Sequence, residues 1–308
     1  MKHILYHDNC LDGKGALYAA LRSDEITQAM SSGEEVKEWP VQYGNPFPFS
    51  PGKQDTIYIL DFSYDRPTLE RVNAACAKLQ VIDHHKTAQE ALAGLPYCIF
   101  DMEKSGAVLA WEYFHPGKPV PGLLLHIQDR DLWKWELSGT KEILAGLRYK
   151  EGFEEEDFDL WDRVEHDTWT RDSLLEVGVI LCNKEARSVQ SAITPNKIAS
   201  VDLRIQSRDG TTLSWKAALL NTTTLVSDIG NQLCQKGYDI AILYFIDNTG
   251  LPVFSFRSIG ATDASLIAKS WGGGGHRNAC GCKSPLNWDR LQGLHSAANV
   301  KREYTIDV

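Results

Sequence analysis

The chain has 308 residues, a length that suggests two domains, and its 43% hydrophobic and 24% charged residues are ordinary for a globular protein. Its net charge of −9 disfavours long duplex nucleic acid as a partner, because affinity for duplexes comes from Lys and Arg residues that neutralise many phosphates. No run of residues approaches the roughly 18–20 apolar positions that span a bilayer, and the first residues lack the apolar core of a signal peptide. We therefore expect a cytoplasmic protein with no membrane partner, whose substrate, if phosphorylated, is small.

The first half of the chain alternates short apolar runs with helix-like segments. Strands are predicted at residues 4–6, 57–60 and 79–82, and helices at 15–21 and 66–77. This alternation predicts an α/β fold with a parallel, Rossmann-like sheet covered by helices on both faces. In such sheets, ligands bind at the carboxyl ends of the strands.

The pattern becomes helical from about residue 123, and a second amphipathic helix is expected at 173–193, before a connection at 195–197. The acidic stretch between them, 154–167, is expected to be a solvated face. Further strands are predicted at 213–220, 239–245 and 253–257, with a hairpin turn at 248–250. We place the domain boundary near 195, so that a helical linker joins domain 1–195 to a smaller α/β domain, 196–308.

Potential metal ligands follow each of the three N-terminal strands. His7 and Asp12 come after the first strand, Asp61 closes the second, and His84 lies in the triplet 83–85 after the third. Any one of them alone would more often be a capping residue, but these four positions together with Asp83, all at strand ends, indicate a site that binds divalent ions. Oxygen and imidazole ligands favour Mn²⁺ or Mg²⁺, and a carboxylate commonly bridges two such ions.

A later acidic residue would complete this ligand set. The segment 128–133 offers Asp129, which we choose, and Asp131, which the sequence does not separate from it because both lie in one helical turn or loop.

A glycine-rich stretch near the C-terminus is the second strong signal. Consecutive glycines let backbone N–H groups approach a phosphate, and neighbouring His and Arg side chains add charge-assisted hydrogen bonds. A flexible surface loop is the alternative. The predicted substrate contacts are Arg257, Ser258, Gly273, Gly274, Gly275, His276 and Arg277.

These clusters resemble the DHH phosphoesterase superfamily, whose signature is the Asp-His-His triplet. The family's four motifs match, in order, residues 7–12, Asp61, the triplet 83–85 and Asp129. The glycine stretch is similar to the GGGGH loop of the DHH-associated domain, which contacts the phosphate or terminal nucleotide of the substrate. Residues 136–195 carry no family motif.

The resemblance implies a metal-dependent phosphodiesterase, of the nanoRNase type, that acts on short single-stranded oligonucleotides or small or cyclic nucleotides with two Mn²⁺ or Mg²⁺ ions. It implies that Asp61 bridges the ions, with His7 on the first and with Asp12, His84 and Asp129 on the second. His85 and Asp83 would be catalytic, His85 by stabilising developing charge on the substrate and Asp83 by orienting His84 or its neighbours.

Cys10 departs from the family pattern, which commonly has Asp at this position. Three outcomes are open: a thiolate ligand that draws the first site toward softer metals, a bystander, or a crippled site. An exopolyphosphatase- or pyrophosphatase-like hydrolase and a catalytically impaired nucleotide sensor therefore remain alternatives. Trp133, Trp135 and Trp271 would either stack on bases or pack in the core. The sequence does not predict the oligomeric state.

Overall fold

The computed structural model describes residues 1–151, 158–207 and 210–308, and the chain divides into two compact units, Met1–Asn183 and Lys184–Val308. The division lies inside the long helix α9 (Thr168–Ala192), before the 3-10 helix η1 (Pro195–Lys197) at which we expected it. The physical reason is that Val189 and Ile193 pack into a core of the second unit, so the end of the linker helix belongs with that unit.

The first unit contains a five-stranded, fully parallel sheet with the strand order β2-β1-β3-β4-β5. Its strands are β1 (Lys2–His7), β2 (Val36–Val41), β3 (Thr56–Leu60), β4 (Lys78–Asp83) and β5 (Cys98–Phe100). The α/β class and the three strands expected in this half are confirmed. Strands β2 and β5 escaped prediction because β2 is largely exposed and β5 has only three residues.

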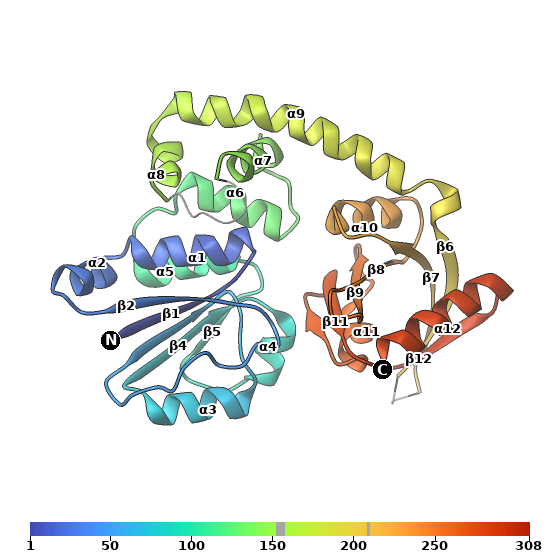
Figure 1. The fold of residues 1–308 in the computed structure, drawn as a ribbon, viewed down its shortest axis with the longest axis horizontal. Coiled ribbons are helices and arrows are strands. Elements are labelled where there is room, and N and C mark those ends of the chain that lie inside the picture. Colours follow the sequence, from blue (N-terminus) through green and yellow to red (C-terminus); the bar gives the residue numbers. More distant parts are fainter. Residues whose placement is uncertain (152–157, 208–209) are drawn as a thin grey trace. The chain divides into compact units, whose positions relative to one another are not determined.

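Helices cover both faces of this sheet, as Figure 1 shows. They are α1 (Leu11–Leu21), α2 (Asp24–Ser31), α3 (Arg66–Ala75), α4 (Lys86–Ala91) and α5 (Gly106–Phe114). Alternate strand residues point to opposite faces. Ile4 and Tyr58 therefore join the core under α1 and α5, whereas Leu5 and Ile59 join the core under α3.

A helical segment completes the first unit and leads into the second. Its helices are α6 (Gly122–Asp131), α7 (Thr140–Glu151), α8 (Phe158–His166) and α9. The expected helices near 123–133 and 173–193 are confirmed as α6 and α9. Of the expected acidic face, residues 154–157 lie outside the described part of the chain. No described helix combines the length and apolar character needed to cross a membrane.

The second unit contains a seven-stranded mixed sheet with the order β10-β11-β9-β8-β7-β6-β12. Its strands are β6 (Ala199–Gln206), β7 (Thr212–Asn221), β8 (Ile240–Ile246), β9 (Pro252–Ser258), β10 (Gly274–Gly275), β11 (Ala279–Lys283) and β12 (Glu303–Asp307). The predicted hairpin is confirmed: β8 and β9 are antiparallel and joined by a turn in which Gly250 has a φ of +80°.

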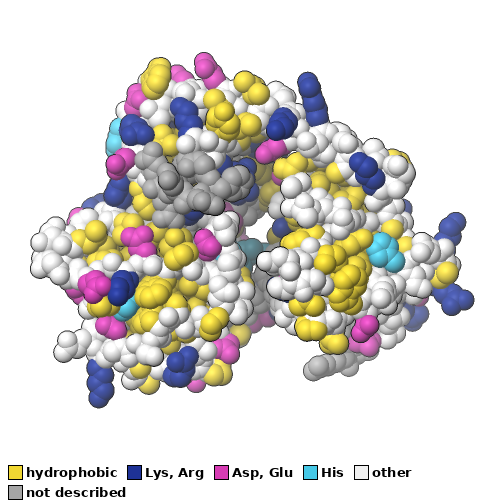
Figure 2. Space-filling model, in the orientation of Figure 1, with side chains coloured by type: hydrophobic (Ala, Val, Ile, Leu, Met, Phe, Trp, Pro, Cys, Tyr) yellow, Lys and Arg dark blue, Asp and Glu magenta, His cyan; other side chains and the backbone are white. Residues whose placement is uncertain are grey.

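Three helices cover this second sheet: α10 (Val226–Gln235), α11 (Ser265–Ser270) and α12 (Asn287–Val300). Residues of α10 form one core with β7 and β8, and residues of α11 and α12 form a second core with the opposite face. Figure 2 shows Lys and Arg side chains scattered among acidic and apolar ones over the described surface in view, in keeping with the net charge of −9.

Candidate metal centre

The carboxyl ends of the central strands of the first unit lie in register. Tyr6 pairs with Leu60, and Leu60 pairs with Ile82. The residues that follow these positions therefore meet at one edge of the sheet. His7, Asp61 and the triplet that begins at Asp83 occupy this edge, as parallel strands require.

Asp61 is the centre of the cluster. Its Oδ2 lies 3.5 Å from His7 Nδ1, and its Oδ1 lies 3.1 Å from His84 Nε2. The residue is 1% exposed and has a φ of +63°, a left-handed backbone conformation that residues other than glycine seldom adopt. Asp61 thus turns its two oxygens toward different imidazoles, which is the arrangement a bridging carboxylate needs.

Asp12 joins the cluster from the first turn of α1. Its carboxylate accepts hydrogen bonds from the backbone N–H groups of Gly106 (2.6 Å) and Ala107 (3.0 Å) at the N-terminus of α5, where a negative charge is favourable. Gly106 also makes room for Asp61, because a Cβ atom at position 106 would lie 2.5 Å from Asp61 Oδ1. Gly106 could not be predicted as a site residue, since a glycine at a helix start gives no indication of which side chain packs against it.

His84 Nε2 faces three carboxylate oxygens. It lies 3.1 Å from Asp61 Oδ1, 3.4 Å from Asp12 Oδ2 and 3.5 Å from Asp131 Oδ2. One imidazole nitrogen carries at most one proton, so it cannot satisfy three acceptors. Asp131 Oδ2 is buried with no hydrogen bond within the described residues. This donor set fits a divalent cation, which binds several oxygens and an imidazole together.

The electrostatics of the cluster lead to the same conclusion. Burial raises the pKa of Asp12 well above its usual range, and the carboxylates of Asp61 and Asp131 raise it further. Burial opposes ionisation of Asp61 as well, but its hydrogen bonds to His7 and His84 lower the pKa of that carboxyl. Burial likewise disfavours the charged imidazole of His84, yet Asp61, Asp131 and Asp12 raise its pKa well above the ordinary value. The cluster therefore requires positive charge, which bound protons or a metal ion can supply.

Asp131 rather than Asp129 faces His84, and this corrects our choice between them. Residues two apart on a helix point in different directions. Asp129 points toward the loop after α6, where it accepts hydrogen bonds from Glu136 N (2.7 Å), Leu137 N (3.2 Å) and Thr140 Oγ1 (2.6 Å). The Asp129 carboxylate therefore holds that loop, and we propose Asp131 as the acidic ligand in its place.

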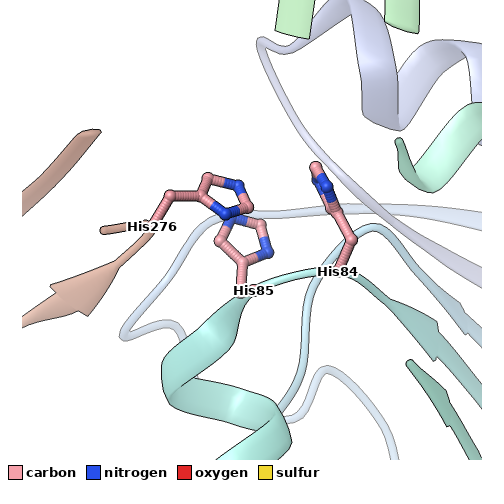
Figure 3. Close-up of side chains that lie close together, drawn as sticks. All are labelled: His84, His85 and His276. Atoms are coloured by element: carbon pink, nitrogen blue, oxygen red, sulfur yellow. The ribbon is translucent and has the colours of Figure 1, made fainter. Parts of the chain in front are cut away.

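Asp83 organises the histidine pair. Its Oδ1 accepts hydrogen bonds from the backbone N–H groups of His84 (2.7 Å) and His85 (3.2 Å) and from His85 Nδ1 (2.7 Å), and its Oδ2 accepts one from Ser63 Oγ (2.5 Å). Asp83 thus orients the neighbouring ring of His85. In Figure 3 the rings of His84 and His85 project from adjacent residues between β4 and α4; their centroids are 5.0 Å apart.

Cys10 lies where a first metal ligand is expected. The ligand atoms of His7, Cys10 and Asp61 lie within 4.8 Å of one another, and so do those of Asp12, Asp61 and His84. Burial raises the pKa of the Cys10 thiol well above its usual range, and Asp61, Asp131 and Asp12 add to the shift. The thiol would consequently stay protonated unless a cation binds beside it.

The glycine stretch forms part of a hairpin in the second unit rather than an open loop. Gly274 and Gly275 are strand β10, paired with Gly281 and Cys280 of β11. A Cβ atom at Gly273 would lie 2.0 Å from the carbonyl oxygen of Gly281, so the close approach of two backbones requires glycine there.

The hairpin turn carries His276 and Arg277. Arg277 is exposed, and its guanidinium donates a hydrogen bond to the carbonyl oxygen of Ala261. His276 belongs to the same turn, through its backbone hydrogen bonds with Ala279.

Two other predicted substrate contacts are engaged within the unit. Ser258 is buried, donates to Thr262 O (2.8 Å) and accepts from Asn278 Nδ2 (2.8 Å). Arg257 bonds Ser227 Oγ (3.1 Å) and Phe256 O (2.9 Å), and within the described residues its guanidinium has no carboxylate at ion-pair distance.

The three tryptophans fall into two groups. Trp271 is 6% exposed and packs against Phe254 and Phe256, so it belongs to the core. Trp133 and Trp135 are half-buried, and their rings contact each other edge to face with a centroid separation of 4.9 Å.

Comparison with known proteins gives two sequence relatives. An uncharacterised protein, R106, of Acanthamoeba polyphaga mimivirus is 29% identical over 300 residues, which cover 90% of this chain and 66% of that protein. The oligoribonuclease NrnB of Bacillus subtilis is 24% identical over 297 residues, which cover 90% of this chain and 72% of NrnB. The chain thus spans just under two thirds of the mimivirus protein. No family model matches the chain.

The chain carries the Asp-His-His triplet on which its resemblance to the DHH superfamily rests. The triplet that gives the superfamily its name follows β4, and the structure brings its His84 together with Asp12 and Asp61 in one cluster.

Two of the solved structures that match the chain have TM-scores just below 0.5. RecJ of Thermus thermophilus in complex with Mn²⁺ is 13% identical, with a TM-score of 0.48 over 99% of this chain and 54% of RecJ. The pGpG-specific phosphodiesterase PggH of Vibrio cholerae is 16% identical, with a TM-score of 0.46 over 97% of this chain and 99% of that chain.

Proposed function

We propose that this protein is a member of the DHH superfamily and a metal-dependent phosphodiesterase that hydrolyses short single-stranded oligonucleotides or small nucleotides. The observation that carries the proposal is Asp61, whose two oxygens face His7 and His84 separately. The kinship with NrnB, an oligoribonuclease, supports a phosphoesterase activity and a short substrate.

The residues divide into two ligand sets around Asp61. We assign His7 and Cys10 to one ion, and Asp12, His84 and Asp131 to the other, with Mn²⁺ or Mg²⁺ as the expected metals. When bound, such ions lower the pKa of a water molecule and offset the charge of a phosphate. In this proposal the acidic residues around Asp61 hold the ions. Their burial at the edge of the sheet limits the access of bulk water to the ions.

His85 and Asp83 have separate roles in this proposal. The hydrogen bond from His85 Nδ1 to Asp83 fixes the ring and its tautomer, so that Nε2 is the nitrogen which meets the substrate. There His85 would stabilise negative charge that develops on a phosphate or leaving oxygen. Asp83, which is fully buried, acts as a positioning residue.

The second unit supplies the substrate contacts in this proposal. Arg277 at the exposed hairpin turn is suited to bind a phosphate, and the half-buried Arg257 has no carboxylate partner within the described residues. Gly273 and Gly275 would shape this surface because they let the backbones approach closely. Ser258 would support it from inside, because its hydroxyl is already hydrogen-bonded within the unit.

Metal-dependent turnover of a substrate panel tests the proposal. We expect the protein with Mn²⁺ to hydrolyse short oligonucleotides or cyclic nucleotides in preference to polyphosphate and pyrophosphate. Asp61→Asn should abolish metal binding and turnover while the fold persists, because Asp61 lies at a strand end. The matched control is Asp159→Asn, whose side chain is 87% exposed. Binding of nucleotides without hydrolysis would indicate a sensor, and hydrolysis of polyphosphate alone would contradict the proposed substrate class.

A further inference from the structure

An aromatic residue that the sequence analysis did not consider lies beside the candidate metal centre. Val41 of β2 pairs with His7 of β1, and the loop after β2 is tied to the loop after β1 by two hydrogen bonds. Asp8 N donates to Val41 O (3.0 Å), and Gln42 Nε2 donates to Asp8 O (2.7 Å). These bonds place Tyr43 at the same edge of the sheet as the metal ligands.

The ring of Tyr43 is held by three aromatic neighbours. Its centroid lies 5.2 Å from that of His7, 5.5 Å from that of His85 and 6.3 Å from that of Phe62, and each pair meets edge to face. Such pairs stabilise a fixed ring orientation. Tyr43 nevertheless remains 51% exposed, whereas Phe62 is 1% exposed. The protein thus holds a large aromatic ring in place while much of its surface stays open to solvent.

The chemistry around this ring limits what it can bind. Both imidazoles in contact with it belong to the phosphodiester chemistry proposed above: His7 as a metal ligand and His85 as a group that meets the substrate. The nearby carboxylates of Asp61 and Asp83 repel additional anions. A neutral, flat group attached to a phosphate is therefore the part of a substrate that suits Tyr43, and a nucleobase has that form. Bases stack on aromatic rings with little sequence preference.

We infer that Tyr43 is a stacking subsite for the nucleobase adjacent to the scissile phosphate, an inference that rests on the phosphodiesterase function proposed above. The ring, and not the hydroxyl, provides the attraction. Tyr43 therefore acts on substrate affinity and leaves metal binding to the acidic cluster.

Variants at position 43 test the subsite with a dinucleotide and Mn²⁺. Tyr43→Ala should raise KM by about 5- to 100-fold, the effect of losing one base stack, with little change in kcat. Tyr43→Phe should keep the wild-type KM because it retains the ring. A dinucleotide analogue with an abasic site in place of the stacked base should bind wild type and Tyr43→Ala equally. The matched control is Tyr149→Ala, which removes another exposed tyrosine, 66% exposed on α7.

Any one of four results would overturn the inference. If Tyr43→Phe loses as much affinity as Tyr43→Ala, the hydroxyl and not the ring is responsible. If Tyr43→Ala weakens binding of the abasic analogue as much as it weakens binding of the intact dinucleotide, the residue supports the metal centre instead. The same conclusion follows if Tyr43→Ala binds less Mn²⁺ than wild type in equilibrium dialysis. An unchanged KM in Tyr43→Ala would remove any role in binding. If the wild-type protein hydrolyses no substrate, the phosphodiesterase proposal fails, and dinucleotide affinities measured by calorimetry with Mn²⁺ decide on the subsite separately.

Discussion

His84 and Asp131 show how strongly the site depends on individual side chains. His84 Nε2 lies among three carboxylate oxygens, from Asp12, Asp61 and Asp131, within 3.5 Å of each. Removing any one of these acids changes the charge of a largely buried cluster, and electrostatic effects are larger in a buried site than at the surface. Each such substitution should therefore reduce metal affinity far more than it reduces the free energy of unfolding.

Replacing Asp131 and Asp129 by Asn in separate variants distinguishes a metal ligand from a residue that holds the loop after α6. Asp131→Asn should lower metal affinity by at least about tenfold, since one anionic ligand is lost, with little change in the free energy of unfolding. Asp129→Asn should instead cost about 1–3 kcal/mol of stability at neutral pH, because Asp129 accepts buried hydrogen bonds. Calorimetric metal titration and urea unfolding measure the two effects, and the reverse outcome would restore Asp129 as the ligand.

The loss of stability expected for Asp129→Asn should also depend on pH. Burial opposes ionisation, but hydrogen bonds from Thr140 and from the N–H groups of Glu136 and Leu137 lower the pKa of Asp129. A lowered pKa stabilises the fold fully above the unfolded value of about 3.9, and this contribution is lost as the pH falls through the folded pKa. The difference in stability between wild type and Asp129→Asn should thus shrink below about pH 4.

Cys10 gives a prediction about metal identity that needs no activity measurement. If its thiol binds as a thiolate beside His7 and Asp61, Co²⁺-loaded protein should show a sulfur-to-metal charge-transfer absorption band. Cys10→Ser should lose this band while the second ligand set still binds metal. Cys182→Ser, on α9, is the control and should keep it. Absence of the band in the wild-type protein would make Cys10 a bystander.

At the scale of elements, the N-terminus of α5 joins the fold to the site. Its first two backbone N–H groups bind Asp12, and its first residue leaves space for Asp61. The helix thereby fixes two acidic groups that come from α1 and from the end of β3. A helix start is suited to this task because its N–H groups have no partners within the helix.

Gly106→Ala should consequently damage the metal centre. The added Cβ would lie 2.5 Å from Asp61 Oδ1 and must displace that carboxylate, so we expect a loss of metal affinity of about tenfold or more, as for other disturbed ligand positions. Gly122→Ala at the start of α6 is the matched control, because its Cβ would meet Glu165 at an ordinary 3.5 Å. Equal metal affinity in the two variants, measured by calorimetry, would show that Asp61 is not held as we describe.

At the scale of the whole molecule, the two units have separate cores, and we assign a different proposed task to each. The first contains the acidic cluster, and the second contains the glycine hairpin and its basic residues. Separate cores mean that a change in one unit can leave the other folded, so metal binding and phosphate binding can be tested independently.

Arg277→Ala tests the proposed binding of phosphate by the second unit. Loss of a charge-assisted hydrogen bond to phosphate should raise KM by about tenfold, equivalent to about 1.4 kcal/mol, with kcat nearly unchanged. Metal binding should not change, because the proposed metal ligands all belong to the other unit. Arg302→Ala, another exposed arginine of the second unit, serves as the control. A fall in kcat at constant KM would contradict a role in binding.

The pattern of apolar runs was enough to predict the parallel sheet and the edge at which acidic and imidazole side chains gather, because such runs define strands and the carboxyl ends of parallel strands share one edge. His7, Asp61 and His84 could be named on that basis. Which of Asp129 and Asp131 turns inward depended on the start and direction of α6, which strand and helix patterns leave uncertain by a few residues. The glycine stretch became a strand because β11 lies beside it, and Tyr43 reached the site through the register of β2 with β1. These pairings join residues that are distant in the chain, so they follow from the three-dimensional fold and not from local sequence patterns.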